Sequence, residues 1–269
     1  MSDQDRHHQN AAYCLSEVRK YAEDQFISLQ FAPREQHARL IALHALALEI
    51  QRIPATVSES PLGAIRQQWW RDALAEIRDG QTPRAHPVVE SISQLPGAGS
   101  EAEACRSVML SIIDGTDTLL QPGEFGSTEQ VLAFAERQYG AVARLVATVL
   151  SPDEAPEIFD MISRLEAVHA VSRTVCEAVR QDSEPVQGVE TFAQRLARFD
   201  RRHPAMRDEL RAALADITRK AAVIPAAVMP GIAHGALAGG YLERAGRGAT
   251  YHPLLKRFAI FRTVLTGRL

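Results

Sequence analysis

The sequence predicts an all-α fold. Apolar residues recur at helical spacing along the chain, and no alternating strand pattern lasts long enough to compete. The 269 residues are 46% hydrophobic and 23% charged, which is typical of a globular protein that buries one sizeable core. Length alone would also allow two domains, but we expect a single helical domain over residues 1–269, with residues 1–10 disordered.

Prolines and capping residues divide this pattern into helices. Pro33 and Pro54 mark two breaks, and Ser60 is a candidate N-cap immediately before Pro61. Glycine-containing stretches mark further breaks. We therefore expect helices over residues 8–29, 34–52, 61–79, 86–94, 101–120, 128–149, 154–181, 190–199, 204–220, 222–244 and 252–267.

The helix expected over 34–52 is apolar around its whole circumference, which predicts a fully buried, central helix. Its only polar stripe consists of His37, His44 and Gln51, spaced by seven residues. Buried polar groups need partners. This stripe therefore either faces a polar cavity or is satisfied by hydrogen bonds within the core.

The helix expected over 61–79 has a broad apolar face that includes Trp69 and Trp70. The tryptophans are interpreted as core anchors rather than as part of a cofactor site. Arg66 projects from the middle of this face, where an unpaired guanidinium would cost several kcal/mol. We therefore expect Arg66 to meet a carboxylate or an anionic ligand.

Two later helices carry candidate polar sites. Asp114 and Asp117, three residues apart in the helix over 101–120, could share Mg²⁺, although a solvated helix face explains them better. In the helix over 154–181, Arg173, Glu177 and Gln181 follow one another at four-residue steps opposite an apolar stripe. That face is either solvated or turned toward an internal cavity.

The stretch over 221–242 has the length of a membrane span, but it contains Pro225, Pro230 and His234. Small residues recur in it every four positions, so one helix face would allow another backbone to approach closely. We expect a buried helix inside a bundle rather than a membrane span.

Composition excludes several classes of function. The 30 basic and 33 acidic residues give a net charge of −3, so no broad basic field is available for nucleic acid. Cys14, Cys105 and Cys176 form no CxxC pair, which predicts neither a disulfide framework nor a zinc site and fits a reducing cytoplasm. The first ten residues are polar, which argues against a secretory signal. Phosphate-loop, HExxH and GxSxG motifs are absent from the sequence.

Five segments occur in a characteristic order between residues 31 and 245. They are FAPREQHARLIALHALALEIQRI, SESPLGAIRQQWWRDALAEIRDG, HPVVESI, SIIDGTDTLL and AVMPGIAHGALAGGYLERA. In this order they resemble the squalene/phytoene synthase family, and more narrowly the branch that includes the mitochondrial complex I assembly factor 6 and its alphaproteobacterial relatives. The most specific part of the signature consists of residues that we expect to be structural: Trp69, Trp70, Arg71, Asp72, His86 and Pro87.

This resemblance implies an isoprenoid synthase fold, in which helices surround a central cavity. In active members, two aspartate-rich helices hold Mg²⁺ ions that bind the diphosphate of a prenyl donor. The first motif should lie at the end of the helix over 34–52, where this sequence has Gln51 and Arg52. The second should lie on the helix over 154–181, where it has Arg173, Glu177 and Gln181. One acid remains where several are expected.

Two hypotheses follow from the resemblance. The first is a non-catalytic protein that assists assembly of respiratory complex I or a related membrane complex. It would be cytoplasmic, with peripheral contact at the inner membrane, a protein partner in a respiratory complex, and an isoprenoid or quinone-like lipid in its cavity. No catalytic residue, cofactor or metal ligand is expected. The candidate cavity-facing residues are His44, Gln51, Arg52, Arg66, Arg173, Glu177 and Gln181.

The second hypothesis is an active Mg²⁺-dependent prenyltransferase with a degenerate metal site. Its unusual ligands would be Asp114, Asp117 and Glu177. Glu177 alone cannot assemble a metal cluster, so this alternative requires the two helices that carry these acids to bring them together.

Overall fold

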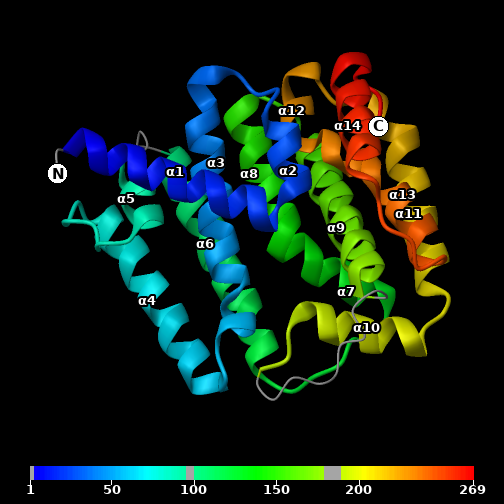
Figure 1. The fold of residues 1–269 in the computed structure, drawn as a ribbon, viewed down its shortest axis with the longest axis horizontal. Coiled ribbons are helices and arrows are strands. Elements are labelled where there is room, and N and C mark those ends of the chain that lie inside the picture. The colour runs from blue at the N-terminus through cyan, green and yellow to red at the C-terminus, as the bar shows by residue number, and fades with distance from the viewer. Residues whose placement is uncertain (1–2, 95–99, 179–188) are drawn as a thin grey trace.

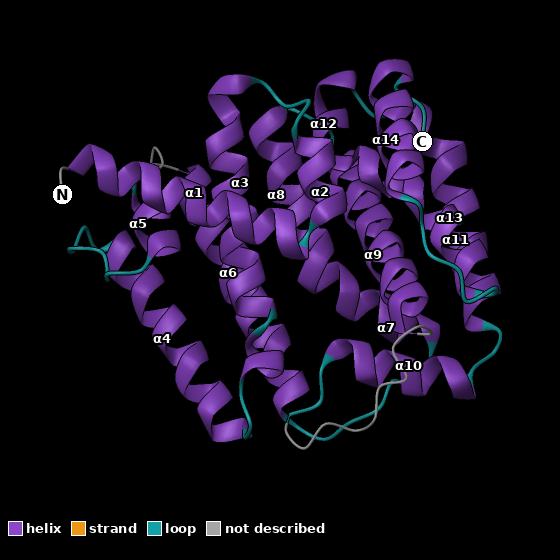
Figure 2. Ribbon diagram, in the orientation of Figure 1, coloured by secondary structure: helices purple, strands orange, loops and turns teal. Residues whose placement is uncertain are grey.

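The computed structural model describes residues 3–94, 100–178 and 189–269. Helices account for all regular structure in these ranges, and no strand occurs in them, so the predicted all-α class is confirmed (Figures 1 and 2). The longer helices are α1 (Asp3–Tyr21), α2 (Glu23–Leu29), α3 (Arg34–Gln51), α4 (Ser60–Arg78), α5 (Pro87–Ser93), α6 (Ser100–Leu120), α7 (Thr128–Ala135), α8 (Ala141–Leu150), α9 (Pro156–Ala178), α10 (Phe192–Arg202), α11 (Met206–Lys220), α13 (Ala238–Ala245) and α14 (Pro253–Thr266).

Two helices organise the core. α3 is buried along most of its length and packs against α1, α5, α6 and α8, as its apolar circumference predicted. α9 occupies the corresponding position in the other half, where α7, α8, α10, α11 and α13 surround it (Figure 1). α8 contacts both α3 and α9 and therefore joins the two halves.

Some predicted boundaries are corrected by the structure. Residues 3–10 belong to α1, so the expected disorder over 1–10 is wrong for this part. The helix predicted over 8–29 divides at Ala22 into α1 and α2. The helix predicted over 128–149 contains a π-helical turn, η2 (Glu136–Gly140), between α7 and α8. Position 181 lies outside the described residues.

The single helix predicted over 222–244 is also wrong. The chain forms short segments there: η3 (Ala221–Val223), η4 (Ala226–Val228), α12 (Met229–Ile232), η5 (Ala233–Leu237) and then α13. Pro225 and Pro230 lack a backbone N–H and cannot continue a helix from the preceding turn. Within the described ranges, no helix has the length and apolarity needed to cross a bilayer.

The small residues predicted to line one helix face do not lie on one continuous helix, but two of them, Gly231 and Gly235, allow close packing. A Cβ atom on Gly231 would lie 2.8 Å from Val146 Cγ1 on α8, and one on Gly235 would lie 2.7 Å from Leu165 Cγ on α9. These distances are shorter than real carbon contacts. Glycine therefore allows η5 to lie directly against α9, and this contact places His234 beside that helix.

Candidate functional site

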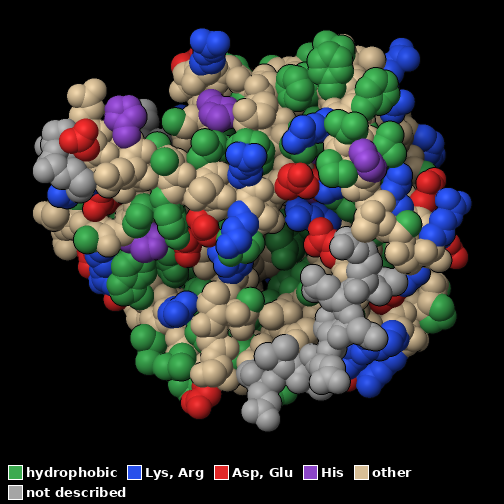
Figure 3. Space-filling model, in the orientation of Figure 1, with side chains coloured by type: hydrophobic (Ala, Val, Ile, Leu, Met, Phe, Trp, Pro, Cys, Tyr) green, Lys and Arg blue, Asp and Glu red, His purple; other side chains and the backbone are tan. Residues whose placement is uncertain are grey.

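A cavity of about 440 Å³ lies between α3 and α9. The face of the molecule in Figure 3 is hollowed near its centre, between the positions of α3 and α9 in Figure 1. The end of α1, α2, α8 and η2 complete its wall. Its lining residues are Tyr21, Ala22, Gln25, His44, Ala47, Leu48, Gln51, Arg52, Ala55, Tyr139, Val142, Glu166, His169, Ala170, Arg173, Thr174 and Glu177.

Gln51 and Arg52, at the end of α3, face this cavity but are engaged by neighbours. Gln51 Nε2 donates a hydrogen bond of 2.5 Å to the backbone oxygen of Gln138. The Arg52 guanidinium lies 2.9 Å from Glu17 Oε2 and stacks over the Tyr21 ring, with its Cζ 3.4 Å from the ring centroid. The positive charge of Arg52 is therefore already compensated.

Arg173 and Glu177, on α9, form an ion pair at the same wall. Arg173 Nε lies 2.9 Å from Glu177 Oε1, one helical turn away. The Glu177 side chain is 44% exposed, whereas that of Arg173 is largely buried. The predicted i, i+4 pair is therefore present, and it faces the cavity rather than open solvent.

His44 contributes a buried neutral imidazole to the cavity. Its Nε2 atom has no hydrogen-bond partner among the described residues. Burial lowers the pKa of His44 to about 4, so the ring is uncharged at neutral pH. A neutral imidazole with a free nitrogen can accept a hydrogen bond or bind a metal ion.

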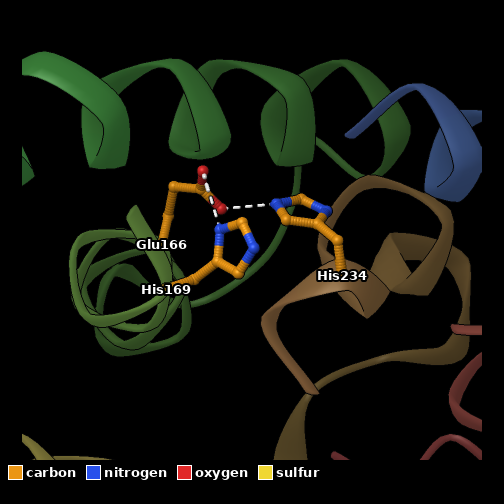
Figure 4. A group of neighbouring side chains, drawn as sticks. All are labelled: Glu166, His169 and His234. Atoms are coloured by element: carbon orange, nitrogen blue, oxygen red, sulfur yellow. Dashed lines mark hydrogen bonds and ion pairs between the residues drawn. The ribbon is translucent and has the colours of Figure 1, made fainter. Parts of the chain in front are cut away.

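A buried chain of ionisable side chains continues behind this wall. Lys256 Nζ on α14 lies 3.0 Å from Asp24 Oδ1 on α2, and His169 Nε2 on α9 lies 3.2 Å from Asp24 Oδ2. Glu166 Oε2, one turn before His169, lies 2.5 Å from His234 Nε2 on η5. Figure 4 shows the Glu166 carboxylate in contact with both His169 and His234. Four separate elements therefore meet in one polar cluster.

The electrostatic environment keeps both carboxyl groups of this buried cluster, Asp24 and Glu166, ionised. Burial alone would raise the pKa of Asp24, but the hydrogen bond from His169 and the nearby charges of Arg173 and Lys256 lower it well below its usual range. Burial would likewise raise the pKa of Glu166, but His234 and His169 lower it. A deprotonated carboxylate is thus fixed beside the cavity.

The pKa of His169 is shifted in the opposite direction. Burial would lower its pKa, but its contacts with Asp24 and Glu166 raise the pKa to about 9. Tyr241 donates a 2.5 Å hydrogen bond to Asp24 Oδ2, and burial followed by the Asp24 charge raises the tyrosine pKa. Tyr241 therefore stays a neutral hydrogen-bond donor.

Five of the candidate residues, His44, Gln51, Arg52, Arg173 and Glu177, line this cavity. The expectation for Arg66 is wrong. Arg66 is exposed on α4 and donates a hydrogen bond of 2.8 Å to Thr56 Oγ1, because α4 buries a face centred on Gly63, Gln67 and Trp70 instead. Gln181 is outside the described residues, so its predicted position has no structural counterpart here.

The signature residues around the two tryptophans form a packing cluster away from the cavity. Trp69 and Trp70 contact each other at 4.9 Å between ring centroids, and His86 lies 5.7 and 5.2 Å from them. His86 also caps α5, whose first residue is Pro87. Asp72 accepts a 2.7 Å hydrogen bond from Gln68.

Arg71 joins the same helix to Asp114 and Asp117 on α6. Its Nη2 atom lies 2.8 Å from Asp114 Oδ1 and 3.0 Å from Asp117 Oδ2. Neither aspartate lines the cavity, and Asp114 borders a separate shallow depression over α6. The structure therefore does not bring Asp114 and Asp117 together with Glu177.

The sequence did not predict most residues of this buried polar cluster. In the sequence, His234 stands out only as a polar residue in an apolar stretch, and no motif singles out Asp24, Glu166, His169 or Lys256. The available signal was weak: each is a charged or titratable residue on a helix face that is otherwise apolar. Their common position depends on four elements that are distant in the chain, which no local pattern encodes.

A model of the family described as squalene/phytoene synthase matches residues 18–166 of the chain, which is more than half of it. Among curated proteins, the chain is 24% identical over 160 residues to the NADH dehydrogenase (ubiquinone) complex I assembly factor 6 of Mus musculus and 22% identical to that of Homo sapiens. Each match covers 60% of this chain but 44% of the relative, so the chain matches less than half the length of these relatives.

Solved structures resemble the whole chain. A dehydrosqualene synthase in complex with a ligand superposes with a TM-score of 0.68 at 10% identity, covering 97% of each chain. A squalene synthase from Alicyclobacillus acidocaldarius gives a TM-score of 0.67 at 12% identity, covering 90% of this chain and 94% of the other. At such low identity these likenesses establish the fold alone, which is the expected isoprenoid synthase fold.

Proposed function

The chain belongs to the squalene/phytoene synthase family, and from that premise we propose that it is a non-catalytic member that assists assembly of respiratory complex I or a related membrane complex. Its cavity would hold a neutral isoprenoid or quinone-like lipid. The observation that carries the proposal is the wall of that cavity, whose described lining contains two carboxylates, Glu166 and Glu177.

The lining residues do not fit the magnesium ions of active family members. Mg²⁺ is bound by oxygen ligands, usually including carboxylates. A site that binds a diphosphate through several Mg²⁺ ions therefore needs several carboxylates. Within the described lining, Glu166 and Glu177 are the only carboxylates. Two carboxylates are fewer than a cluster of several Mg²⁺ ions requires, and Glu177 is paired with Arg173. We therefore derive no step through Mg²⁺.

The cationic groups of the wall do not supply a substitute diphosphate site. Arg52 and Arg173 are the only arginines in the described lining, and each is paired with a carboxylate. A leaving diphosphate would have to break these pairs to have its charge compensated. A neutral lipid needs no such rearrangement, and the cavity volume lies in the range of about 300–1,000 Å³ that is typical of small-molecule sites.

The proposed role in assembly rests on the curated relatives, which are named complex I assembly factors. Their 22–24% identity and the partial coverage of their length make this transfer a proposal. The alternative, a prenyltransferase with a degenerate metal site, is less well supported, because Asp114 and Asp117 pair with Arg71 outside the cavity.

The C-terminal helix α14 supports the proposed peripheral contact with the inner membrane. Figure 3 shows hydrophobic side chains gathered at the position of α14, with Lys and Arg side chains at their edge. Exposed apolar side chains beside arginines are suited to an anionic bilayer surface, because they combine apolar burial with attraction to lipid headgroups. The exposed residues are Leu254, Leu255, Phe258, Phe261 and Leu265, and the exposed arginines of the helix are Arg257 and Arg262.

Deletion of the gene in the organism that encodes this chain tests the proposal. We expect isolated membranes to lose NADH:quinone oxidoreductase activity, and we expect a plasmid carrying the chain to restore it. Succinate:quinone oxidoreductase activity, measured in the same membranes, controls for general respiratory damage. Normal NADH:quinone oxidoreductase activity in the deletion strain would contradict the proposal.

A further inference from the structure

We propose that Glu166, His169 and His234 bind a divalent transition-metal ion at the wall of the cavity. Each residue offers one ligand atom, and the three atoms lie within 4.8 Å of one another. All three side chains are buried, and Glu166 and His169 also line the cavity. This inference goes beyond the proposed function and does not depend on it.

The local geometry directs the three ligands to one point. Glu166 and His169 lie one turn apart on the same face of α9, and His234 approaches from η5 (Figure 4). Glu166 lies 2.5 Å from His234 Nε2 and 3.7 Å from His169 Nδ1. Ligands of a tetrahedral ion with metal–ligand distances of about 2.1 Å are separated by about 3.4 Å. A bound ion would therefore replace the hydrogen bond between Glu166 and His234 and move these two atoms apart, while Glu166 and His169 Nδ1 already lie near the required separation.

His169 is oriented as a metal ligand would be. Its Nε2 atom lies 3.2 Å from Asp24 Oδ2, and its Nδ1 atom has no hydrogen-bond partner although the side chain is fully buried. A proton on Nε2, donated to Asp24, leaves the Nδ1 lone pair directed toward Glu166. Histidines that bind metals commonly donate their other ring N–H to a carboxylate in this way. Gln25 holds Glu166 through a hydrogen bond of 2.8 Å.

The donor set indicates the class of metal. Two imidazole nitrogens and one carboxylate oxygen suit Zn²⁺ or Fe²⁺, whereas Mg²⁺ and Ca²⁺ prefer oxygen ligands alone. Three protein ligands leave a coordination position open, and two of the three, Glu166 and His169, line the cavity. The ion would therefore be accessible to a molecule bound in the cavity.

A titration of the full chain with Co²⁺ tests this site. Protein stripped with a chelator and dialysed is titrated with Co²⁺ and then with Zn²⁺, and visible absorption, bound metal and melting temperature are recorded. We expect one Co²⁺ per chain, visible bands of a four- or five-coordinate ion, displacement by Zn²⁺, and an increase in melting temperature. Less than about 0.1 ion bound per chain, without a thermal shift, would overturn the proposal.

Variants distinguish this site from adventitious binding. His169→Gln and His234→Gln should abolish the one-to-one absorption bands, and Asp24→Asn should weaken Co²⁺ binding by about 10–100-fold because Asp24 positions His169. His37→Gln on α3 is the matched control and should bind as the wild type does. Circular dichroism identifies any variant that fails to fold, and in that case the wild-type titration decides. One-to-one binding that survives in folded His169→Gln and His234→Gln proteins would contradict the assignment.

Discussion

At the scale of single residues, His169 connects two carboxylates of the buried cluster. It is fully buried, contacts Asp24 through one nitrogen and faces Glu166 through the other. A buried ion-paired histidine is costly to disturb, because removing one partner leaves an uncompensated charge. The state of this imidazole, protonated or bound to metal, therefore determines the charge of the whole cluster.

In metal-free protein, the pKa of about 9 for His169, against the ordinary 6.5, makes stability depend on pH. Because the pKa is raised on folding, its stabilising contribution is complete below pH 6.5 and is lost as pH rises through 9. This contribution to the free energy of unfolding is on the order of 3 kcal/mol. Urea unfolding of chelator-treated protein at pH 6.5 and 9.5 measures it. The wild type should lose more stability over this interval than His169→Gln; equal losses would contradict the account.

At the scale of elements, the periodic helices were predictable and the meeting of distant residues was not. α3 and α4 lie within one residue of their predicted bounds, because an apolar pattern and a proline break are local signals. The prediction of one helix over 222–244 was wrong because tertiary packing fixes several short turns around Pro225 and Pro230. The prediction for Arg66 was wrong because α4 buries a different face. This face includes Gly63 and Gln67, while Leu62 and Ile65 remain exposed.

The candidate site was predictable in part for the same reason. Arg173 and Glu177 were identified because their four-residue spacing is visible within one helix. Asp24, His169 and His234 come together only because α2, α9 and η5 converge, and that convergence depends on the close packing of η5 on α9 at Gly235. A site built across elements leaves little trace in any single one.

The contact of η5 with α9 predicts the effect of an added methyl group. In Gly235→Ala, the Cβ atom would lie 2.7 Å from Leu165 Cγ, and such overpacking typically costs about 1–3 kcal/mol. Gly239→Ala is the matched control, because its Cβ atom would lie 3.5 Å from Leu214 Cδ2, an ordinary contact. Urea unfolding should show a clear loss for Gly235→Ala and little change for Gly239→Ala. Equal stability of the two variants would contradict the close approach.

The exposed face of α14 predicts binding to anionic vesicles. The wild-type chain should sediment with phosphatidylglycerol vesicles, and Phe258→Ser should reduce binding by about tenfold, since burying such a side chain contributes about 1.5–3 kcal/mol. Ile65→Ser on α4 is the matched control, because Ile65 is 66% exposed and Phe258 is 65% exposed. Absence of wild-type sedimentation, or equal losses in both variants, would contradict a membrane-binding role for α14.

At the scale of the whole molecule, the chain has the isoprenoid synthase fold. The superposition on a dehydrosqualene synthase covers 97% of each chain, so the arrangement of helices has been preserved at 10% identity. The ends of α3 and the inner face of α9 carry Gln51, Arg52, Arg173 and Glu177, all engaged by hydrogen bonds or ion pairs. Our central proposal is that this cavity does not ionise prenyl diphosphates.

Release of diphosphate from farnesyl diphosphate tests that claim most directly. The full chain is incubated with labelled farnesyl diphosphate and Mg²⁺, and an active squalene synthase assayed in parallel shows that the assay detects turnover. We predict release no faster than in the protein-free blank. Multiple turnovers per chain at a rate near the usual enzymatic range of about 1 s⁻¹ or more would contradict the account.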